Sequence, residues 1–272
     1  MNNLGKNIYS KRKELGLTQQ ELADKLHISF QAVSKWENSG AYPDIELLPE
    51  IAAILGTTVD SLLGYAAVHK TDYEERYKTN DYYWGLVPNR LCHEIMKLCP
   101  PVKPLKVLDI GCGEGKDAVF FARNGYNVTA FDYADSGLEK ARSLAERFGV
   151  EINFFKADIN DFRLTENYDI VFSSGVFHYI KPEIRSQIAD NIKLHINTGG
   201  IAAINVFVKK PFIERAPDSE SSEENKQWKS GELLTLFHDW KINSFKEEIF
   251  DCMSGGVPHR HCMDILIAEK LV

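Results

Sequence analysis

A glycine-rich segment behind an acidic residue is the part of this sequence best suited to hold a ligand. It reads Leu-Asp-Ile-Gly-Cys-Gly-Glu-Gly over residues 108–115, and it follows an apolar run that is typical of a buried strand. A helical pattern begins directly after it, so the segment joins a strand to the N-terminus of a helix. Glycines allow a sharp turn and leave room for a ligand against the backbone, and the helix adds N–H donors. This arrangement is the first unit of a nucleotide-binding α/β sheet.

Two other glycine loops do not fit the spacing. A P-loop needs a longer gap between its glycines and a hydroxyl residue after the lysine, but Asp117 follows Lys116 here. A dinucleotide loop has its third glycine five residues after the first, whereas Gly115 comes four residues after Gly111. The sequence therefore disfavours ATP hydrolysis and dinucleotide binding.

The pattern apolar-apolar-Asp-apolar-Gly-x-Gly-x-Gly resembles the first motif of the S-adenosylmethionine (SAM) methyltransferases. The resemblance implies that the loop cradles the methionine end of SAM. An acidic loop suits this ligand, which carries a sulfonium and an ammonium group. The residues expected to bind it here are Asp109, Gly111, Cys112, Gly113 and Gly115. We expect Cys112 to be a small buried residue and not a nucleophile.

The elements after the loop must bring further polar groups to the same edge. Strand patterns at 127–132, 152–159, 168–174 and 199–207 alternate with helical ones, which predicts a doubly wound α/β domain. Asp132 ends the second strand, 23 residues after Asp109, where a carboxylate can accept both hydroxyls of a ribose. By itself, an acid at such a place is equally a helix cap or a turn residue.

The methyltransferase resemblance assigns further residues to SAM. It implies that Asp158, after the third strand, binds the adenine amine and that Ile159 packs on the adenine ring. Tyr133, directly after the second strand, and Ser173, near the end of the fourth, are added to this set. Residues 81–85, Asp-Tyr-Tyr-Trp-Gly, resemble a stretch that folds over the SAM pocket in small-molecule methyltransferases, so Tyr83 and Trp84 are SAM-binding candidates, with packing as the alternative.

The end of the fourth strand bears on the methyl acceptor. Residues 173–176 read Ser-Ser-Gly-Val, without the Pro-Pro-aromatic word of amino-group DNA methyltransferases, and the sequence has no Pro-Cys pair for cytosine chemistry. DNA is therefore not the expected substrate. His178 comes next and lies near the pocket mouth by topology, either as a general base or as a packing residue.

A second resemblance covers residues 80–272. The segment 254–261, Ser-Gly-Gly-Val-Pro-His-Arg-His, together with residues 82–85 and 228–233, is similar to the tellurite-resistance methyltransferase group. The match implies catalytic roles for His259 and Arg260. Arginine suits an oxyanion and histidine can add charge or take a proton, so tellurite or selenite is an implied acceptor. Cys252, His259, His261 and Cys262 are also metal-ligand types, but they form no common zinc word, and no metal is expected.

Residues 4–64 predict short helices, with Thr18 and Glu21 forming a capping box. The words Leu-Thr-Gln-Gln-Glu-Leu-Ala and Val-Ser-Lys-Trp-Glu-Asn resemble the Cro and phage-repressor family of helix-turn-helix regulators. The family geometry implies that helix 30–38 enters the major groove. The residues assigned to DNA are Gln19, Phe30, Gln31, Ser34, Lys35 and Asn38, and those expected in the core are Ala32, Val33 and Trp36. A helical bundle used only for dimerisation is the alternative.

Charge and length complete the expectations. The domains are predicted at residues 1–66 (helix-turn-helix), 67–104 (aromatic linker and first helices) and 105–272 (methyltransferase). Residues 1–64 hold six basic and eight acidic residues, so one copy should bind DNA weakly, and a homodimer is expected. The net charge of −7, the five cysteines and the absence of a membrane-length apolar run or a signal-peptide core favour a cytoplasmic protein.

We expect a DNA-binding regulator fused to a SAM-dependent methyltransferase that acts on a small molecule or oxyanion. The alternative is a transcription factor whose second domain only senses SAM or a metabolite.

Overall fold

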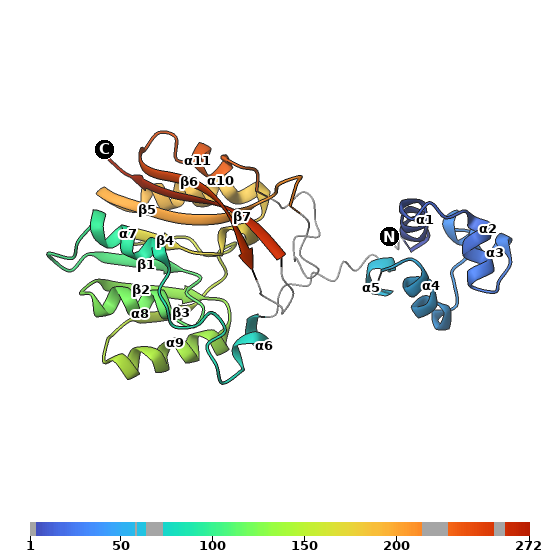
Figure 1. The fold of residues 1–272 in the computed structure, drawn as a ribbon, viewed down its shortest axis with the longest axis horizontal. Helices are drawn as coiled ribbons and strands as arrows, with labels where there is room; N and C mark the ends of the chain where they lie inside the picture. The colour runs from blue at the N-terminus through green and yellow to red at the C-terminus, as the bar shows by residue number, and fades with distance from the viewer. Residues whose placement is uncertain (1–3, 58, 64–72, 214–227, 253–258) are drawn as a thin grey trace. The chain divides into compact units, whose positions relative to one another are not determined.

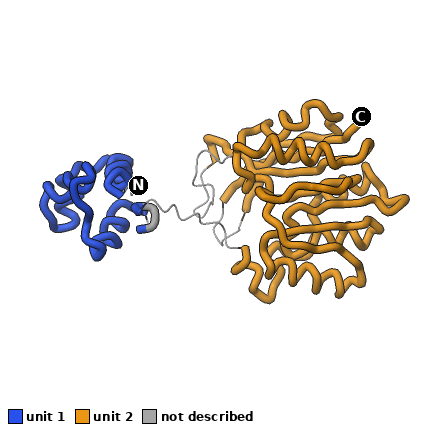
Figure 2. Tube along the Cα trace, turned by 180° about the vertical axis from the view of Figure 1, so that it is seen from behind, with its two compact units in different colours: residues 1–70 blue, residues 71–272 orange. Residues whose placement is uncertain are grey.

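The structure is a computed structural model that describes residues 4–57, 59–63, 73–213, 228–252 and 259–272 (Figure 1). The chain forms two compact units, residues 1–70 and residues 71–272 (Figure 2). Each unit has its own hydrophobic core. Among the described residues, no helix has the length and apolar character needed to cross a membrane.

The N-terminal unit is a bundle of short helices. They are α1 (Leu4–Glu14), α2 (Gln19–Lys25), α3 (Phe30–Glu37), the 3₁₀ turn η1 (Ile45–Leu47), α4 (Leu48–Ile54) and α5 (Val59–Leu62). The capping box is confirmed, because Thr18 accepts from the Glu21 backbone and Glu21 accepts from that of Thr18. Val33 and Trp36 are buried and Ala32 packs against them, as predicted. The 3₁₀ turn η1 leads directly into α4, and Pro49 lies in the first turn of α4.

The C-terminal unit is built on one seven-stranded sheet in the order β3-β2-β1-β4-β5-β7-β6. Its strands are β1 (Lys106–Ile110), β2 (Asn127–Asp132), β3 (Asn153–Lys156), β4 (Tyr168–Ser173), β5 (Ile196–Val208), β6 (Lys241–Cys252) and β7 (His259–Glu269). The first five are parallel, and β7 is antiparallel to both β5 and β6. This confirms the predicted α/β fold. The strand β6 was not predicted, because it lies at the edge and has no continuous buried run.

Helices cover both faces of the sheet. Neighbouring strand residues point to opposite faces, so the apolar strand residues form a core on each side. Val107 packs in one core with α7 (Arg90–Leu98) and α8 (Lys116–Arg123), beside α9 (Asp135–Phe148). Leu108 packs in the other core with α10 (Arg185–Leu194) and α11 (Glu232–Leu236). The remaining helical turns are α6 (Tyr73–Tyr77), η2 (Phe177–Tyr179) and η3 (Pro182–Ile184).

The strand directions bring several chain segments together at one edge of the sheet, the one formed by the carboxyl-terminal ends of the parallel strands. The parallel strands β1 to β5 all end there, and β7 begins there because Val208 at the end of β5 pairs with Cys262. The strand β6 ends at the same edge, where Cys252 pairs with His259. The glycine loop, the turn that carries His178 and the β6–β7 ends therefore share one edge.

Candidate active site

The glycine loop is fastened to the next strand and packed from the side. The backbone N–H groups of Gly111 and Cys112 both donate to the carbonyl of Phe131, over 2.8 and 2.9 Å. Gly115 has φ +84°, in the left-handed region that glycine tolerates, and directly precedes α8. A Cβ atom there would lie 2.6 Å from the Cβ of Ala141 on α9. The loop therefore requires glycine at this position for both its backbone shape and its contact with α9.

Asp132 lies at the end of β2 with its carboxylate turned toward the glycine loop. One oxygen accepts from the backbone N–H of Gly113 over 2.8 Å, and the other accepts from that of Ala134 over 2.9 Å. Each carboxylate oxygen has two lone pairs, so both retain the capacity to accept from a ligand. Burial raises the pKa of Asp132 above its ordinary value. A cationic ligand nearby would favour the ionised form.

Asp109 and Ser173 lie deeper, within the sheet. The Asp109 side chain is buried, and its Oδ2 atom has no hydrogen-bond partner in the described part of the chain. Burial, followed by the charge of Asp117, raises the pKa of Asp109 well above its usual range. The Ser173 hydroxyl donates to the carbonyl of Ile110 over 3.1 Å, which joins β4 to β1. Cys112 is buried and its pKa is raised well above the ordinary thiol value, chiefly by burial, which disfavours a nucleophilic thiolate.

The predicted adenine-binding residues follow β3. The Oδ1 atom of Asp158 accepts from the backbone N–H of Asn160 over 2.9 Å and from its side-chain amide over 3.0 Å. Ile159 is buried in the same core as Leu108. Tyr133, after β2, accepts from the backbone N–H of Tyr73 over 3.3 Å. These residues share the edge with Asp132.

An aromatic cap covers the glycine loop. Its members are Tyr73, Tyr77, Tyr83, Trp84, Tyr133 and Tyr179. Tyr77 of α6 is buried, and its hydroxyl oxygen lies 2.8 Å from where a Cβ atom on Gly113 would be. The indole N–H of Trp84 donates to the Tyr77 hydroxyl over 3.3 Å, and the Tyr83 ring meets the Trp84 ring edge-on at 4.8 Å. The structure thus brings the predicted Tyr83 and Trp84 to the loop through Tyr77, which was not predicted.

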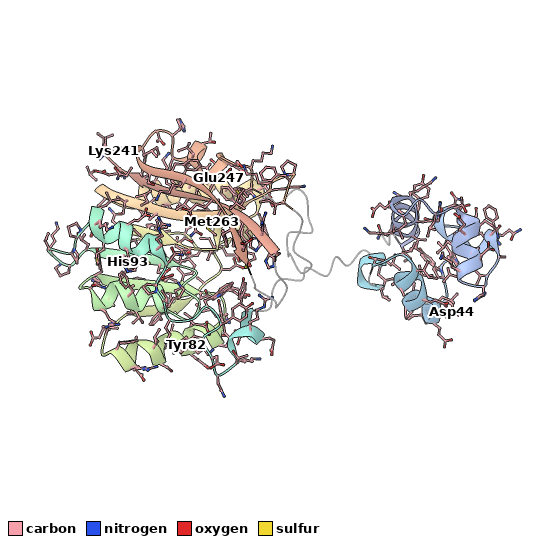
Figure 3. All side chains as sticks on the ribbon, viewed as in Figure 1. Asp44, Tyr82, His93, Lys241, Glu247 and Met263 are labelled. Atoms are coloured by element: carbon pink, nitrogen blue, oxygen red, sulfur yellow. The ribbon has the colours of Figure 1, made fainter. Side chains whose placement is uncertain are left out.

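A buried ion pair ties the segment 81–85 to the loop. Glu114 accepts from the ammonium group of Lys140 over 2.6 Å and from the backbone N–H of Trp84 over 3.3 Å. Lys140 also donates to the carbonyl of Asp81 over 2.6 Å, and the hydroxyl of Tyr82 donates to the Lys140 carbonyl over 3.3 Å (Figure 3 labels Tyr82). In the sequence, only Glu114 inside the glycine loop pointed to this network. Its partner Lys140 lies on α9, far along the chain from the loop.

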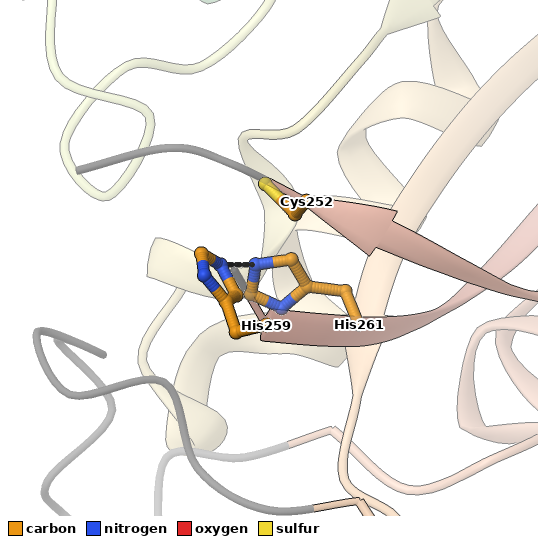
Figure 4. A group of neighbouring side chains, drawn as sticks. All are labelled: Cys252, His259 and His261. Atoms are coloured by element: carbon orange, nitrogen blue, oxygen red, sulfur yellow. Dashed lines mark hydrogen bonds between the residues drawn. The ribbon is translucent and has the colours of Figure 1, made fainter. Parts of the chain in front are cut away.

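Three histidines, His178, His259 and His261, lie at this edge of the sheet, near the end of β5 and the start of β7. The Nδ1 atom of His178 is buried and has no hydrogen-bond partner among the described residues. Its ring packs on Tyr179 and Phe207, with centroids at 4.0 and 4.7 Å. Burial, and then His261, lowers the pKa of His178 to about 3, so this imidazole is neutral at physiological pH. The Nε2 atoms of His259 and His261 lie 2.9 Å apart (Figure 4).

Arg260 does not join this group. Successive strand residues point to opposite faces, so Arg260 lies on the other face of β7 from His259 and His261. Its Nε atom donates to Asp251 over 3.0 Å, and its side chain is 69% exposed. The structure therefore pairs His259 with His261, and not with Arg260.

The helix-turn-helix candidates lie mostly on the exposed side of α3. Phe30, Gln31, Lys35 and Asn38 are exposed, and Ser34 is half-buried. The Asn38 amide donates to the carbonyl of Ser34 over 2.9 Å. An exposed polar helix face beside a buried one is what a helix in the major groove requires.

Gln19 is held by a buried ion pair. Its side-chain amide donates to Glu37 over 2.6 Å. Glu37 in turn accepts from two nitrogens of Arg12, over 2.6 and 2.8 Å, and both charged side chains are buried. The hydrogen bond with Glu37 raises the pKa of Arg12. This network joins α1, α2 and the end of α3, and Arg12 and Glu37 were not predicted as functional or core residues.

Comparison with known families assigns both units. A model described as tellurite resistance protein TehB matches residues 74–255, and a helix-turn-helix model matches residues 8–62. The probable SAM-dependent methyltransferase TehB of Haemophilus influenzae strain Rd is 28% identical over 224 residues, which cover 82% of this chain and 68% of that protein.

Solved structures share the fold. The crystal structure of TehB from Haemophilus influenzae aligns with a TM-score of 0.59 and 23% identity, covering 73% of this chain and 65% of that one. A Burkholderia thailandensis N1-methyltransferase, crystallised with 1,6-didemethyltoxoflavin and S-adenosylhomocysteine, aligns with a TM-score of 0.54 and 19% identity, covering 77% of this chain and 90% of that one. The chain thus spans about two thirds of the length of both TehB relatives.

Proposed function

Because this chain belongs to the family of tellurite resistance protein TehB and also carries a helix-turn-helix unit, we propose that it is a DNA-binding regulator fused to a working methyltransferase. The methyl acceptor is a small molecule or an oxyanion of the tellurite or selenite type. Methyltransferase chemistry and SAM as the donor follow from the family and its relatives. When bound, SAM supplies an electrophilic methyl group on a sulfonium.

The observation that carries the SAM site is the geometry of Asp132. One oxygen accepts from the backbone N–H of Gly113 in the loop, the other accepts from that of Ala134 after β2, and the carboxylate can accept ribose hydroxyls as well. Gly111, Gly113 and Gly115 then take the methionine end, while Asp158 and Ile159 take the adenine. The acidic edge also suits the ligand's two positive charges. These residues therefore fit the donor that the family uses.

We assign the acceptor side to His178 and His259, and we retain Arg260 as a candidate although its side chain is paired with Asp251. The imidazole of His178 is neutral, so it can accept a hydrogen bond from the methyl acceptor without placing a positive charge beside the sulfonium; its low pKa disfavours full proton transfer to it. Because Arg260 lies on the other face of β7 from His259, it would have to leave Asp251 and reach around the strand to contact the same oxyanion. Methyl transfer depends mainly on alignment and desolvation, so positioning by these side chains is sufficient chemistry.

In the N-terminal unit, we assign DNA contact to the exposed face of α3. Phe30, Gln31, Ser34 and Lys35 face the bases, and Asn38 and Gln19 lie toward the phosphates. A homodimer would supply the two copies that a palindromic site requires. We place this regulator in the cytoplasm, where DNA and SAM are both available.

Turnover tests this proposal. The full chain, SAM and a panel of acceptors that includes tellurite, selenite and small thiols should yield S-adenosylhomocysteine above the level without acceptor. Binding of SAM with no turnover on any acceptor would contradict a working enzyme and favour the sensor alternative. In that case DNA affinity should change when SAM is added.

A further inference from the structure

The end of the β6–β7 hairpin carries three metal-ligand side chains on one face. Cys252 and His259 are directly paired across the ladder, and His261 follows His259 by two residues, so the strand period keeps all three together (Figure 4). The sulfur and one nitrogen from each ring lie within 4.8 Å of one another. The three come from two strands and from both sides of the hairpin end, so their meeting is set by the strand register.

The two imidazole nitrogens are spaced nearly as in a metal site. Ligand bonds of 2.0–2.3 Å in a tetrahedral zinc site place the ligand atoms about 3.4 Å apart. The two Nε2 atoms are 2.9 Å apart, so they need to open by only about half an ångström. A thiolate with two imidazoles is a donor set that Zn²⁺ prefers, whereas Mg²⁺ and Ca²⁺ prefer oxygen.

We propose that Cys252, His259 and His261 bind one Zn²⁺ ion. The spacing Cys-x₆-His-x-His is not a common zinc-binding motif, so no metal was expected from the sequence. The β6–β7 register brings the three side chains together although the sequence spacing does not indicate it. Three protein ligands leave the fourth tetrahedral position open, as in zinc sites that hold water or a substrate.

The surroundings suit an open site of this kind. The His261 ring packs against Phe207 at 4.6 Å and Phe250 at 5.8 Å, and these apolar rings lower the local dielectric on one side. His178 packs on the same Phe207 ring. The open position therefore lies at the sheet edge that also carries the glycine loop. There the ion would bind an anionic acceptor, a role that rests on the proposed function, whereas metal binding itself does not.

Cobalt substitution tests metal binding independently of catalysis. The untagged full chain is stripped with a chelator and titrated with Co²⁺, then with Zn²⁺, while the absorption spectrum is followed. We expect one equivalent of Co²⁺, a thiolate-to-cobalt charge-transfer band, intense tetrahedral d–d bands, and displacement by one equivalent of Zn²⁺. The absence of any stoichiometric site would overturn the proposal.

Variants identify the ligands. Cys252→Ser should remove the charge-transfer band, and both Cys252→Ser and His261→Asn should weaken Zn²⁺ binding at least tenfold. The matched controls are Cys99→Ser and His238→Gln, which lie on α7's C-terminal cap and after α11 and should leave the titration unchanged. Unaltered Co²⁺ spectra in Cys252→Ser and His261→Asn, with circular dichroism showing folded protein, would refute this ligand set. SAM calorimetry on the same samples reports separately on the proposed function.

Discussion

Two aspartates of the same sheet show how position decides what a carboxylate can do. Asp132 ends its strand, and both of its oxygens accept backbone N–H groups beside the loop. Asp109 lies one strand away but inside the sheet, where its Oδ2 atom is buried without a partner among the described residues. The sequence assigned both to SAM; the two backbone hydrogen bonds support that proposal for Asp132, whereas the Asp109 side chain is buried within the sheet. We interpret Asp109 as a buried acid whose protonated form is favoured by its surroundings.

The first prediction concerns pH and Asp109→Asn. Because burial raises the pKa of Asp109 above its ordinary value, the folded protein binds more protons there than the unfolded chain. The free energy of unfolding should therefore fall as pH rises from about 4 toward the raised pKa, by about 1.4 kcal/mol for each pH unit in that interval. Asp109→Asn should lack this decline. Urea unfolding over the pH range from about 4 to about 8 checks it; parallel curves for the two proteins would contradict the assignment.

The second prediction separates a functional glycine from one that only shapes a turn. Gly113→Ala should weaken SAM binding at least tenfold, because φ is +53° and the new Cβ atom would meet the Tyr77 hydroxyl at 2.8 Å. Gly149→Ala is the matched control, with φ +65° and no atom within 4 Å of the added Cβ. Both should lose about 1 kcal/mol of stability from backbone strain, but only Gly113→Ala should lose affinity in calorimetry. Equal affinities would place the ligand elsewhere.

At the scale of elements, the sequence predicted what is periodic and missed what depends on pairing. The strands β1, β2 and β4 are short buried runs that end at turn residues, so their ranges were readable. The edge strand β6 has no continuous apolar run, and α6 has only five residues, so neither was predicted. The meeting of Cys252 with His261 depends on the β6–β7 register, which one sequence does not specify.

The helix-turn-helix unit provides the third prediction. Arg12→Ala should destabilise this unit by about 3–5 kcal/mol, because it leaves Glu37 as an unpaired buried charge and also disturbs the hydrogen bond from Gln19. Lys11→Ala removes an exposed pair with Glu14 and should change stability by less than about 1 kcal/mol. Chemical unfolding followed by Trp36 fluorescence, in a background where the other tryptophans are replaced by Phe, compares them. A small effect of Arg12→Ala would show that the pair is dispensable.

The recognition helix carries the fourth prediction. Lys35→Ala and Gln31→Ala should each reduce affinity for duplexes selected from a random pool by about 1–3 kcal/mol, because they lie on the exposed face of α3. Lys11→Ala, on α1, is the surface-charge control. Fluorescence anisotropy measures binding at fixed salt. If Lys11→Ala weakens binding as much as the α3 variants do, the proposed groove contact is contradicted, and the affinity comes from general electrostatic attraction.

At the scale of the whole molecule, a helix-turn-helix unit and a methyltransferase unit have separate hydrophobic cores. Separate cores predict two unfolding transitions in calorimetry. A ligand that binds one folded unit stabilises that unit alone, so SAM should raise only the Tm of the methyltransferase transition. A parallel shift of both transitions would indicate energetic coupling between the units and support SAM sensing by the regulator.

Titration of SAM into the full chain, and into its Asp132→Ala variant, is the most direct test of the central claim. We predict one SAM bound per chain, with affinity at least tenfold lower, or about 1.4 kcal/mol, once the carboxylate is removed. A folded wild-type chain that binds neither SAM nor S-adenosylhomocysteine, or an Asp132→Ala variant that binds SAM as tightly as the wild type, would contradict the site described for this edge of the sheet.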